Sequence, residues 1–295
     1  MDLRTNKHLI ADISLLAVTC IWGATFVTVK NAIELAPPYT FNGIRFALAA
    51  LTMLPFVLRG ITKINRSLFL AGITLGVFLF LGYSFQTIGL KYTTASNAGF
   101  ITGLSVVLVP VLTTIYNRKL PEPNILLGVL SATTGLALLT LNDKLQFNFG
   151  DMLEFFCAIS FALHVFGVGY FSPKYETGPL VMLQIITVGI LSTATGLLTE
   201  KPHVIFNYEL IEALVITAVF ATTLAFYIQN RMQKFTTAAR TAIIFSMEPV
   251  FSAFFAWFLL GETFTARSIV GGILVLMGML LSEIRFTRKK AYPNG

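Results

Sequence analysis

Glu248, followed directly by Pro249, is the residue of this sequence best placed to do chemistry. It lies in the run FSMEPVFSAFFAWFLLGE, residues 245–262, within an apolar segment long enough to cross a bilayer. A charge at the bilayer centre costs at least ~2.5 kcal/mol on insertion scales, and a proline inside a helix removes a hydrogen bond and kinks the helix. The pair indicates either a proton or substrate-ammonium site at a helix break, or a structural carboxylate that fixes helix packing.

Two further ionisable side chains fall inside apolar segments. Arg45 can bind a substrate carboxylate or counter the charge of Glu248, but we expect it rather to extend its guanidinium to the membrane interface. His164 can relay protons at physiological pH. A lone histidine in such a segment is, however, more often a neutral core residue that forms hydrogen bonds.

Two amides and two aromatic residues complete the candidate site. Gln86 and Gln229 can line a polar path or hold helices together by hydrogen bonds, and the second role is the commoner one. Trp22 and Tyr83 can stack on a substrate. Because the chain holds 27 Phe, 9 Tyr and 2 Trp residues, most of its aromatic side chains must serve packing.

The composition is that of an integral membrane protein. Of the 295 residues, 55% are hydrophobic and only 12% are charged, whereas about a quarter of a soluble domain is charged. The net charge of +7 comes from Lys and Arg residues in short loops and tails, which argues against a nucleic-acid partner. Cys20 and Cys157 both lie in apolar segments, so we expect no disulfide framework.

Apolar segments of about twenty residues predict membrane-spanning helices. Arg4 and Lys7 precede the first of them as in a signal peptide, but this run is too long and shows no cleavage site, so we interpret it as a membrane helix. The sequence predicts ten spans, at residues 9–29, 40–58, 68–90, 97–116, 124–141, 152–171, 179–198, 210–230, 239–260 and 267–284.

The basic residues predict the orientation of these spans. With a cytoplasmic N-terminus, fourteen Lys and Arg residues lie inside: Arg4, Lys7, Arg59, Lys63, Arg66, Arg118, Lys119, Lys174, Arg231, Lys234, Arg285, Arg288, Lys289 and Lys290. Five lie outside: Lys30, Lys91, Lys144, Lys201 and Arg267. This bias predicts that both termini are cytoplasmic.

The chain resembles itself at a spacing of 143 residues. LGYSFQTIGLKYTTA at 81–95 and LAFYIQNRMQKFTTA at 224–238 agree at six of fifteen positions, and Gln86 corresponds to Gln229. Each half holds five predicted spans. Because five is odd, the halves must be inverted relative to one another, as in many secondary transporters, whose substrate sites lie near the midplane between the repeats.

Four segments resemble the EamA-type permeases of the drug/metabolite transporter superfamily. They are WGATF at 22–26, RFALAAL at 45–51, TTASNAGFITGL at 93–104 and EPVFSAFFAWFLLGE at 248–262, and the last is the most specific. The resemblance implies an all-α polytopic membrane protein with ten transmembrane helices in two inverted five-helix repeats. It also implies alternating-access transport of small metabolites such as amino acids, often outward.

We therefore expect two EamA-like repeats, at 9–141 and 151–285, and a secondary transporter of the cytoplasmic membrane that exports a small molecule. A passive channel, a non-transporting scaffold and a membrane enzyme are the alternatives. The sequence has neither a GxxxxGK[ST] phosphate loop nor an HExxH motif, so we expect no ATP hydrolysis, metal site or bound cofactor. Proton coupling and homodimerisation remain open.

Overall fold

Every regular element in the described part of the chain is a helix. The computed structural model describes residues 3–58, 60–93, 95–140, 148–201, 203–260 and 265–283. Seven helices are continuous: α1 (Leu3–Leu35), α2 (Pro38–Val57), α3 (Arg66–Gly89), α6 (Pro123–Thr140), α7 (Phe149–Phe171), α8 (Thr177–Thr199) and α13 (Ala266–Glu283).

Three further rods of helix are divided into segments. The first consists of α4 (Ala95–Gly103) and α5 (Ser105–Asn117), and another of α11 (Ala238–Phe245) and α12 (Glu248–Leu260). Between them in the sequence, α9 (Tyr208–Val215) and α10 (Ala225–Met232) flank the π-helical segment η2 (Ile216–Leu224). Two short 3₁₀ turns, η1 (Ile61–Lys63) and η3 (Gln233–Phe235), lie in connections.

Each predicted span coincides with one continuous helix or one divided rod. The bounds agree within three residues, except for α1, which is 33 residues long and extends beyond the predicted span 9–29 at both ends. Six of the helices or rods are long and apolar enough to cross a membrane, and three shorter helices, at 101–117, 123–138 and 269–282, are also apolar. The chain is therefore a multi-pass membrane protein.

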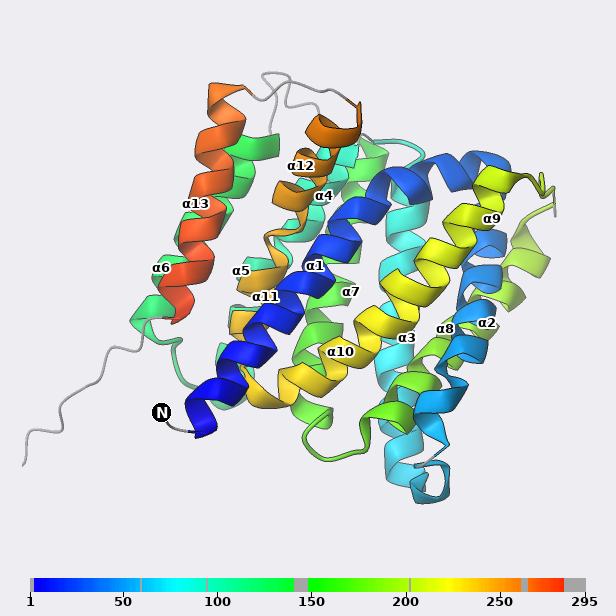
Figure 1. The fold of residues 1–295 in the computed structure, drawn as a ribbon, viewed down its shortest axis with the longest axis horizontal. Coiled ribbons are helices and arrows are strands. Elements are labelled where there is room, and N and C mark those ends of the chain that lie inside the picture. The colour runs from blue at the N-terminus through cyan, green and yellow to red at the C-terminus, as the bar shows by residue number, and fades with distance from the viewer. Residues whose placement is uncertain are drawn as a thin grey trace, which may run out of the picture.

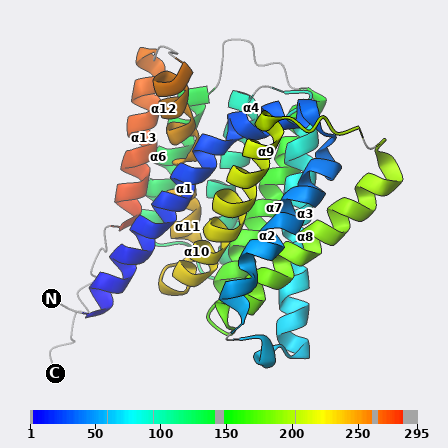
Figure 2. The same ribbon diagram turned by 45° about the vertical axis from the view of Figure 1, so that its right-hand side comes forward.

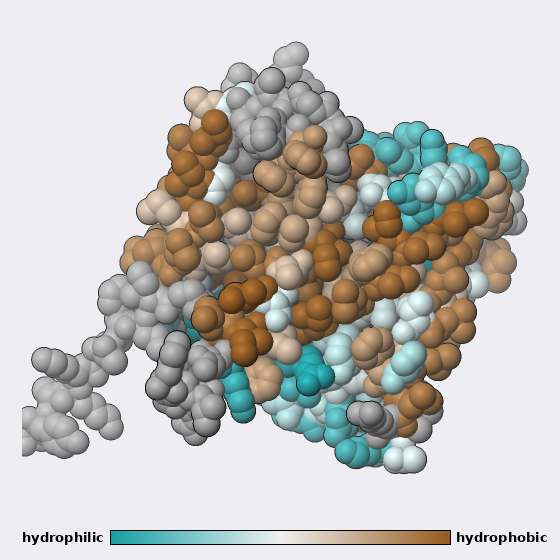
Figure 3. All heavy atoms as spheres, viewed as in Figure 1, coloured by the Kyte–Doolittle hydropathy of each residue, from teal (hydrophilic) through white to brown (hydrophobic). Residues whose placement is uncertain are grey.

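The connections between helices gather alternately at two ends of the molecule. The start of α1, η1, the α5–α6 and α7–α8 connections and η3 lie at the lower end in Figure 1, and the α1–α2, α3–α4 and α8–α9 connections lie at the upper end. Successive helices thus run in opposite directions. Apolar side chains cover the visible flanks of α13 and of the α9–α10 rod, as lipid contact requires (Figure 3).

Pairs of corresponding helices from the two halves pack together at opposite flanks. α6 contacts α13 at one flank, and α2 contacts α8 at the other (Figure 2). Between α6 and α13, the Ser131 hydroxyl donates a hydrogen bond to the carbonyl of Leu274, at 2.8 Å and 143 residues away. Ser131 thus contacts its own repeat counterpart, as a residue on a two-fold axis must.

Glycines on either side of this hydrogen bond show the same reciprocity. A Cβ on Gly128 would lie 2.8 Å from the carbonyl oxygen of Gly278, and a Cβ on Gly135 would lie 2.6 Å from that of Gly271. Since the repeat pairs Gly128 with Gly271 and Gly135 with Gly278, exchanging the halves converts one contact into the other. Only glycine allows the two backbones to approach this closely.

We expect the Gly278→Ala substitution to destabilise the protein, because the added methyl group would lie 2.7 Å from the carbonyl oxygen of Gly128 and 2.8 Å from the Ala132 nitrogen. Overpacking of this kind costs about 1–3 kcal/mol. Thermal unfolding in detergent should show a midpoint several degrees below that of the unmodified protein. Gly272→Ala on the same helix is the control, since its methyl group would meet Val250 at an ordinary 3.6 Å. Equal midpoints for the two variants would contradict the close crossing.

Candidate functional site: a central cavity between two broken helices

Two helices at the centre of the molecule are broken at corresponding positions. The α4–α5 rod is interrupted at Leu104, whose N–H bonds the carbonyl of Ile101 at 3.1 Å. The α11–α12 rod is interrupted before Glu248, where the Met247 N–H bonds the carbonyl of Ile244, also at 3.1 Å. Ile244 and Met247 are the repeat counterparts of Ile101 and Leu104, so the same tight turn closes both breaks.

Each break is followed by a polar residue that begins the next helix. Ser105 begins α5 and Glu248 begins α12, and the two positions are again 143 residues apart. Pro249 lies in the first turn of α12, where the missing N–H is tolerated because no residue of that turn needs an intrahelical acceptor. The sequence-based expectation of a broken helix is confirmed, and the break lies at Ser246-Met247, directly before Glu248-Pro249.

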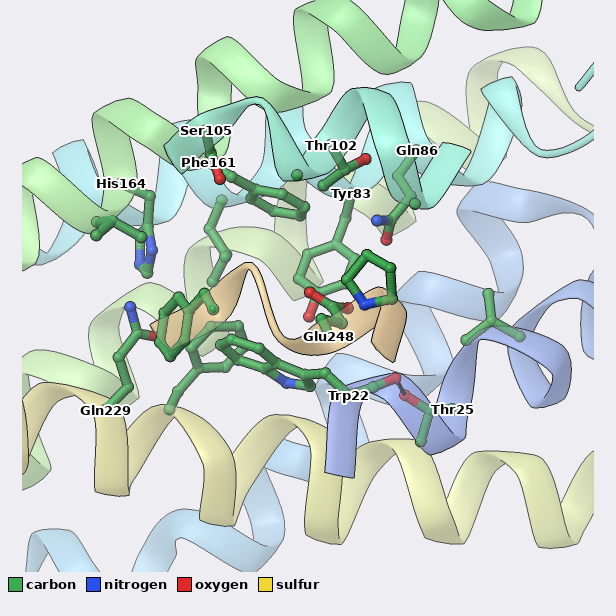
Figure 4. A pocket seen from close by; sticks show the side chains of 18 of the residues that line it. Trp22, Thr25, Tyr83, Gln86, Thr102, Ser105, Phe161, His164, Gln229 and Glu248 are labelled. Carbon is green, nitrogen blue, oxygen red and sulfur yellow. Dashed lines mark hydrogen bonds between the residues drawn. The ribbon is translucent and has the colours of Figure 1, made fainter. Parts of the chain in front are cut away.

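The side chains around the breaks line one cavity of about 90 Å³, which is large enough to hold several water molecules. Figure 4 shows the residues that line the cavity, together with the part of the α11–α12 rod that carries Glu248. All eight residues singled out from the sequence line this cavity: Trp22, Arg45, Tyr83, Gln86, His164, Gln229, Glu248 and Pro249. The fold thus brings together residues from α1, α2, α3, α7, α10 and α12.

The carboxyl group of Glu248 points into the cavity between Tyr83 and Trp22 (Figure 4). It makes no hydrogen bond and no ion pair with any residue that the structure describes. Arg45 lines the same cavity but does not approach the Glu248 carboxylate within the 4.0 Å of an ion pair. The described part of the chain thus offers no paired neighbour of the kind that a structural ion pair would require.

Arg45 does not extend to the membrane interface, so that expectation was wrong. Its side chain is only 3% exposed. Its Nε donates to the Thr222 hydroxyl at 2.9 Å, its Nη2 donates to the Tyr83 hydroxyl at 3.2 Å, and the guanidinium lies over the Tyr83 ring at 4.7 Å. Two acceptors and an aromatic face inside the bundle replace the water that the guanidinium would otherwise seek.

The π-helical segment η2 positions two of the cavity residues. Trp22 Nε1 donates to the carbonyl of Ala221 at 2.9 Å, and the next residue, Thr222, accepts the bond from Arg45. Thr223 in turn donates to the carbonyl of Ala49 at 3.0 Å. A π turn is wider than an α turn and has a different pattern of backbone hydrogen bonds. Such turns occur often at functional sites.

A chain of buried amides holds His164. Its Nε2 lies 2.9 Å from the Oε1 of Gln184, whose Nε2 donates to the Asn230 side chain at 3.1 Å. Asn230 donates onward to the carbonyl of Phe226 at 2.9 Å. Because Gln184 presents its oxygen, Nε2 of His164 carries the proton, and the residue forms hydrogen bonds in the core as the sequence favoured.

The two glutamines of the repeat differ in their surroundings. Gln229 is 1% exposed, its Nε2 makes only a long 3.5 Å bond to Gln233, and its Oε1 has no partner among the described residues. Gln86 is half-buried and lines the cavity near the end of α3. Gln229 therefore leaves an acceptor at the cavity that a bound solute or water can satisfy.

Several lining residues were not identified from the sequence. Thr25, Thr102, Ser105 and Phe161 all face the cavity. Ser105 could have been identified from the sequence, because the 143-residue repeat relates it to Glu248. The other three resemble ordinary residues of apolar helices, and nothing in their spacing distinguishes them.

An all-helical membrane protein with a polar cavity between two broken helices is the class that this geometry defines, and similarity to known proteins agrees. The EamA-like transporter family matches residues 9–141 and 148–284. The chain belongs to this family, and it is a membrane transporter.

Individual relatives agree with this assignment. An uncharacterized transporter of Archaeoglobus fulgidus is 37% identical over 279 residues, which cover 95% of this chain and 87% of that protein. A probable amino-acid metabolite efflux pump of Salmonella typhimurium is 26% identical, over 95% of this chain and 97% of that protein. A protein of known crystal structure shares the fold at 17% identity with a TM-score of 0.77, over 92% of this chain and 96% of that one.

We expect the Tyr83→Phe substitution to destabilise the protein, because the buried Nη2 of Arg45 loses its acceptor. An unsatisfied buried donor costs about 1–3 kcal/mol. Thermal unfolding in detergent measures the effect. Tyr227→Phe is the matched control, because among the described residues the Tyr227 hydroxyl accepts only from the exposed Arg231. If both variants unfold at the temperature of the unmodified protein, the Arg45–Tyr83 bond does not hold the site together.

Proposed function

We propose that this protein is a secondary transporter that moves small metabolites, such as amino acids, outward across the cytoplasmic membrane by alternating access. The observation that carries the proposal is the meeting of two broken helices at a cavity that contains Glu248. Broken helices at membrane depth line substrate and ion sites, because their free backbone groups need polar partners there.

In this proposal, ten helices and divided rods cross the membrane as two inverted five-helix repeats. The antiparallel contact of α6 with α13, with Ser131 bonded to its own counterpart, supports the inversion. The matched breaks at Leu104 and Met247 support it at the site itself. Both termini are cytoplasmic, which puts the lower end of Figure 1 inside the cell.

The cavity chemistry suits a small zwitterion or neutral solute. It holds one carboxyl group, one guanidinium and one imidazole among aromatic walls. A polyphosphate would require several cations, which the cavity does not offer. A space of about 90 Å³ is below the 300–1,000 Å³ of typical ligand pockets, so solute entry must displace lining side chains.

The two-fold arrangement supports alternating access as the mechanism. Leu90 and Val29 also line the cavity, which therefore reaches from the breaks toward the upper, outer end. At the inner side, Trp22 packs against Phe226 and Phe245 with ring centroids 5.7 and 5.0 Å apart. Rocking of the repeats would separate these rings and close the outer side. Glu248, at the hinge of this motion, binds the solute ammonium or a proton.

We expect Glu248→Gln to abolish saturable uptake of radiolabelled amino acids by proteoliposomes, because the amide cannot carry the charge that the solute or proton requires. Flux should fall at least tenfold at equal protein incorporation. Glu209→Gln, in the exposed first turn of α9, is the control and should keep full flux. Full activity of the Glu248→Gln protein would refute the role of Glu248, and conductance without saturation would favour a channel.

Cysteine labelling tests the orientation. In a background with Cys20 and Cys157 replaced, we expect a membrane-impermeant maleimide to label a cysteine at Lys201 in intact cells. A cysteine at Lys63 should react only after the cells are opened, although both positions are exposed in the structure. The reverse pattern would invert the topology.

A further inference from the structure

A second buried carboxyl group, Glu154 on α7, lies behind the cavity wall. It is 0% exposed, and its Oε2 accepts a hydrogen bond from the Thr102 hydroxyl at 3.1 Å. Its Oε1 has no partner among the described residues. Thr102, in contrast, lines the cavity directly. Thr102 therefore connects the acid to the cavity.

The crossing of α3 and α7 explains why Glu154 is sealed from water. Gly89 and Gly150 meet there so closely that a Cβ on Gly150 would lie 2.8 Å from the carbonyl oxygen of Gly89. A Cβ on Gly89 would lie 2.7 Å from Oε1 of Glu154. The glycine thus makes room for the carboxyl group but provides no side-chain donor for Oε1.

Among the described residues, the titratable groups around Glu154 are two acids, a thiol and a phenol, and none of them is a cation. Asp151, one turn earlier, accepts from the Thr93 hydroxyl and from the Asn148 backbone in a capping box. Cys157, one turn later, lies 3.8 Å from the Thr102 hydroxyl. From the neighbouring helices, Glu248 on α12 and Tyr83 on α3 face the same region. No described cation forms an ion pair with Glu154.

We propose that Glu154 is a proton-binding site whose protonation state Thr102 reports to the cavity. A threonine hydroxyl has one donor and two acceptor positions. With Glu154 ionised, the hydroxyl proton points at Oε2, and Thr102 offers only acceptors to the cavity. With Glu154 protonated, the carboxyl O–H donates to Thr102, and the threonine proton is released to bond a solute or water in the cavity.

This switch would couple proton binding at Glu154 to solute binding in the cavity, although the proton and the solute do not touch. The proton reaches Glu154 through Thr102: the Thr102 hydroxyl gives its proton to Oε2 and takes another from a hydronium ion in the cavity, and the reverse exchange returns the proton to water. In the proposed orientation Glu154 lies five residues, or ~8 Å at 1.5 Å per residue, from the outer end of α7. A buried carboxylate with one hydrogen bond is costly in free energy. A change in the surroundings of Glu154 during the proposed transport cycle therefore changes its affinity for a proton. The inference rests on the proposed transport function.

The first test compares solute flux with and without an imposed pH gradient, as a ratio for each variant. We expect the gradient to change flux several-fold in the unmodified protein and to leave it unchanged in Glu154→Gln, which cannot titrate. Thr102→Val should abolish the response as well, since it removes the hydroxyl, and Thr102→Ser should restore it. Glu209→Gln should behave as the unmodified protein. A ratio that Glu154→Gln does not alter would overturn the proposal.

The second test measures the proton directly and needs no solute. Infrared difference spectra between acidic and alkaline pH should show a carboxylic C=O band that Glu154→Gln removes and Glu209→Gln retains. If no solute is transported but the band behaves so, the proposed function fails while the proton site stands. If the band is absent from the unmodified protein, or persists in Glu154→Gln, the site itself is refuted. If Glu154→Gln removes the band but leaves the flux ratio with and without the pH gradient unaltered, Glu154 is a structural acid, and the coupling of its proton to transport is refuted.

Discussion

The need to satisfy every backbone polar group away from water is the constraint on which this structure depends. In a membrane, non-helical backbone is tolerated only where protein or trapped water can bond it. Both interrupted rods are therefore placed at the centre, facing one another across the cavity, while the continuous helices α6, α8 and α13 lie at the flanks. The breaks create the polar site, and the surrounding helices separate it from lipid.

A third irregularity, the π segment in the α9–α10 rod, serves the same site from the other side. Its carbonyl at Ala221 and hydroxyl at Thr222 orient Trp22 and Arg45, which otherwise have few polar partners in an apolar bundle. The three departures from regular helix thus surround one cavity. At the π segment, a backbone carbonyl and a side-chain hydroxyl bond residues that line the cavity.

The sequence predicted the helices and much of the site, for physical reasons that also set its limits. Span positions followed from the length of apolar runs, and Glu248, Arg45 and His164 were found because charge in such runs is costly. Glu154 was overlooked because it falls only two residues inside the predicted span 152–171, where a carboxylate can be taken for an interfacial residue. Arg45 was misplaced because its partner Thr222 is distant in sequence and indistinguishable from any other threonine in an apolar helix.

The two repeats have corresponding backbone breaks but carry different side chains at the cavity. This difference matters for transport in one direction. Corresponding breaks and glycine contacts show that the two halves share the same backbone arrangement at these positions. Glu248 in one repeat faces Ser105 at the equivalent place in the other, and Tyr83 corresponds to Phe226. A perfectly symmetric pair would populate its two access states equally. In the proposed alternating-access cycle, the unmatched carboxyl group gives a solute or proton a different affinity for the two access states, so ligand binding shifts the balance between them.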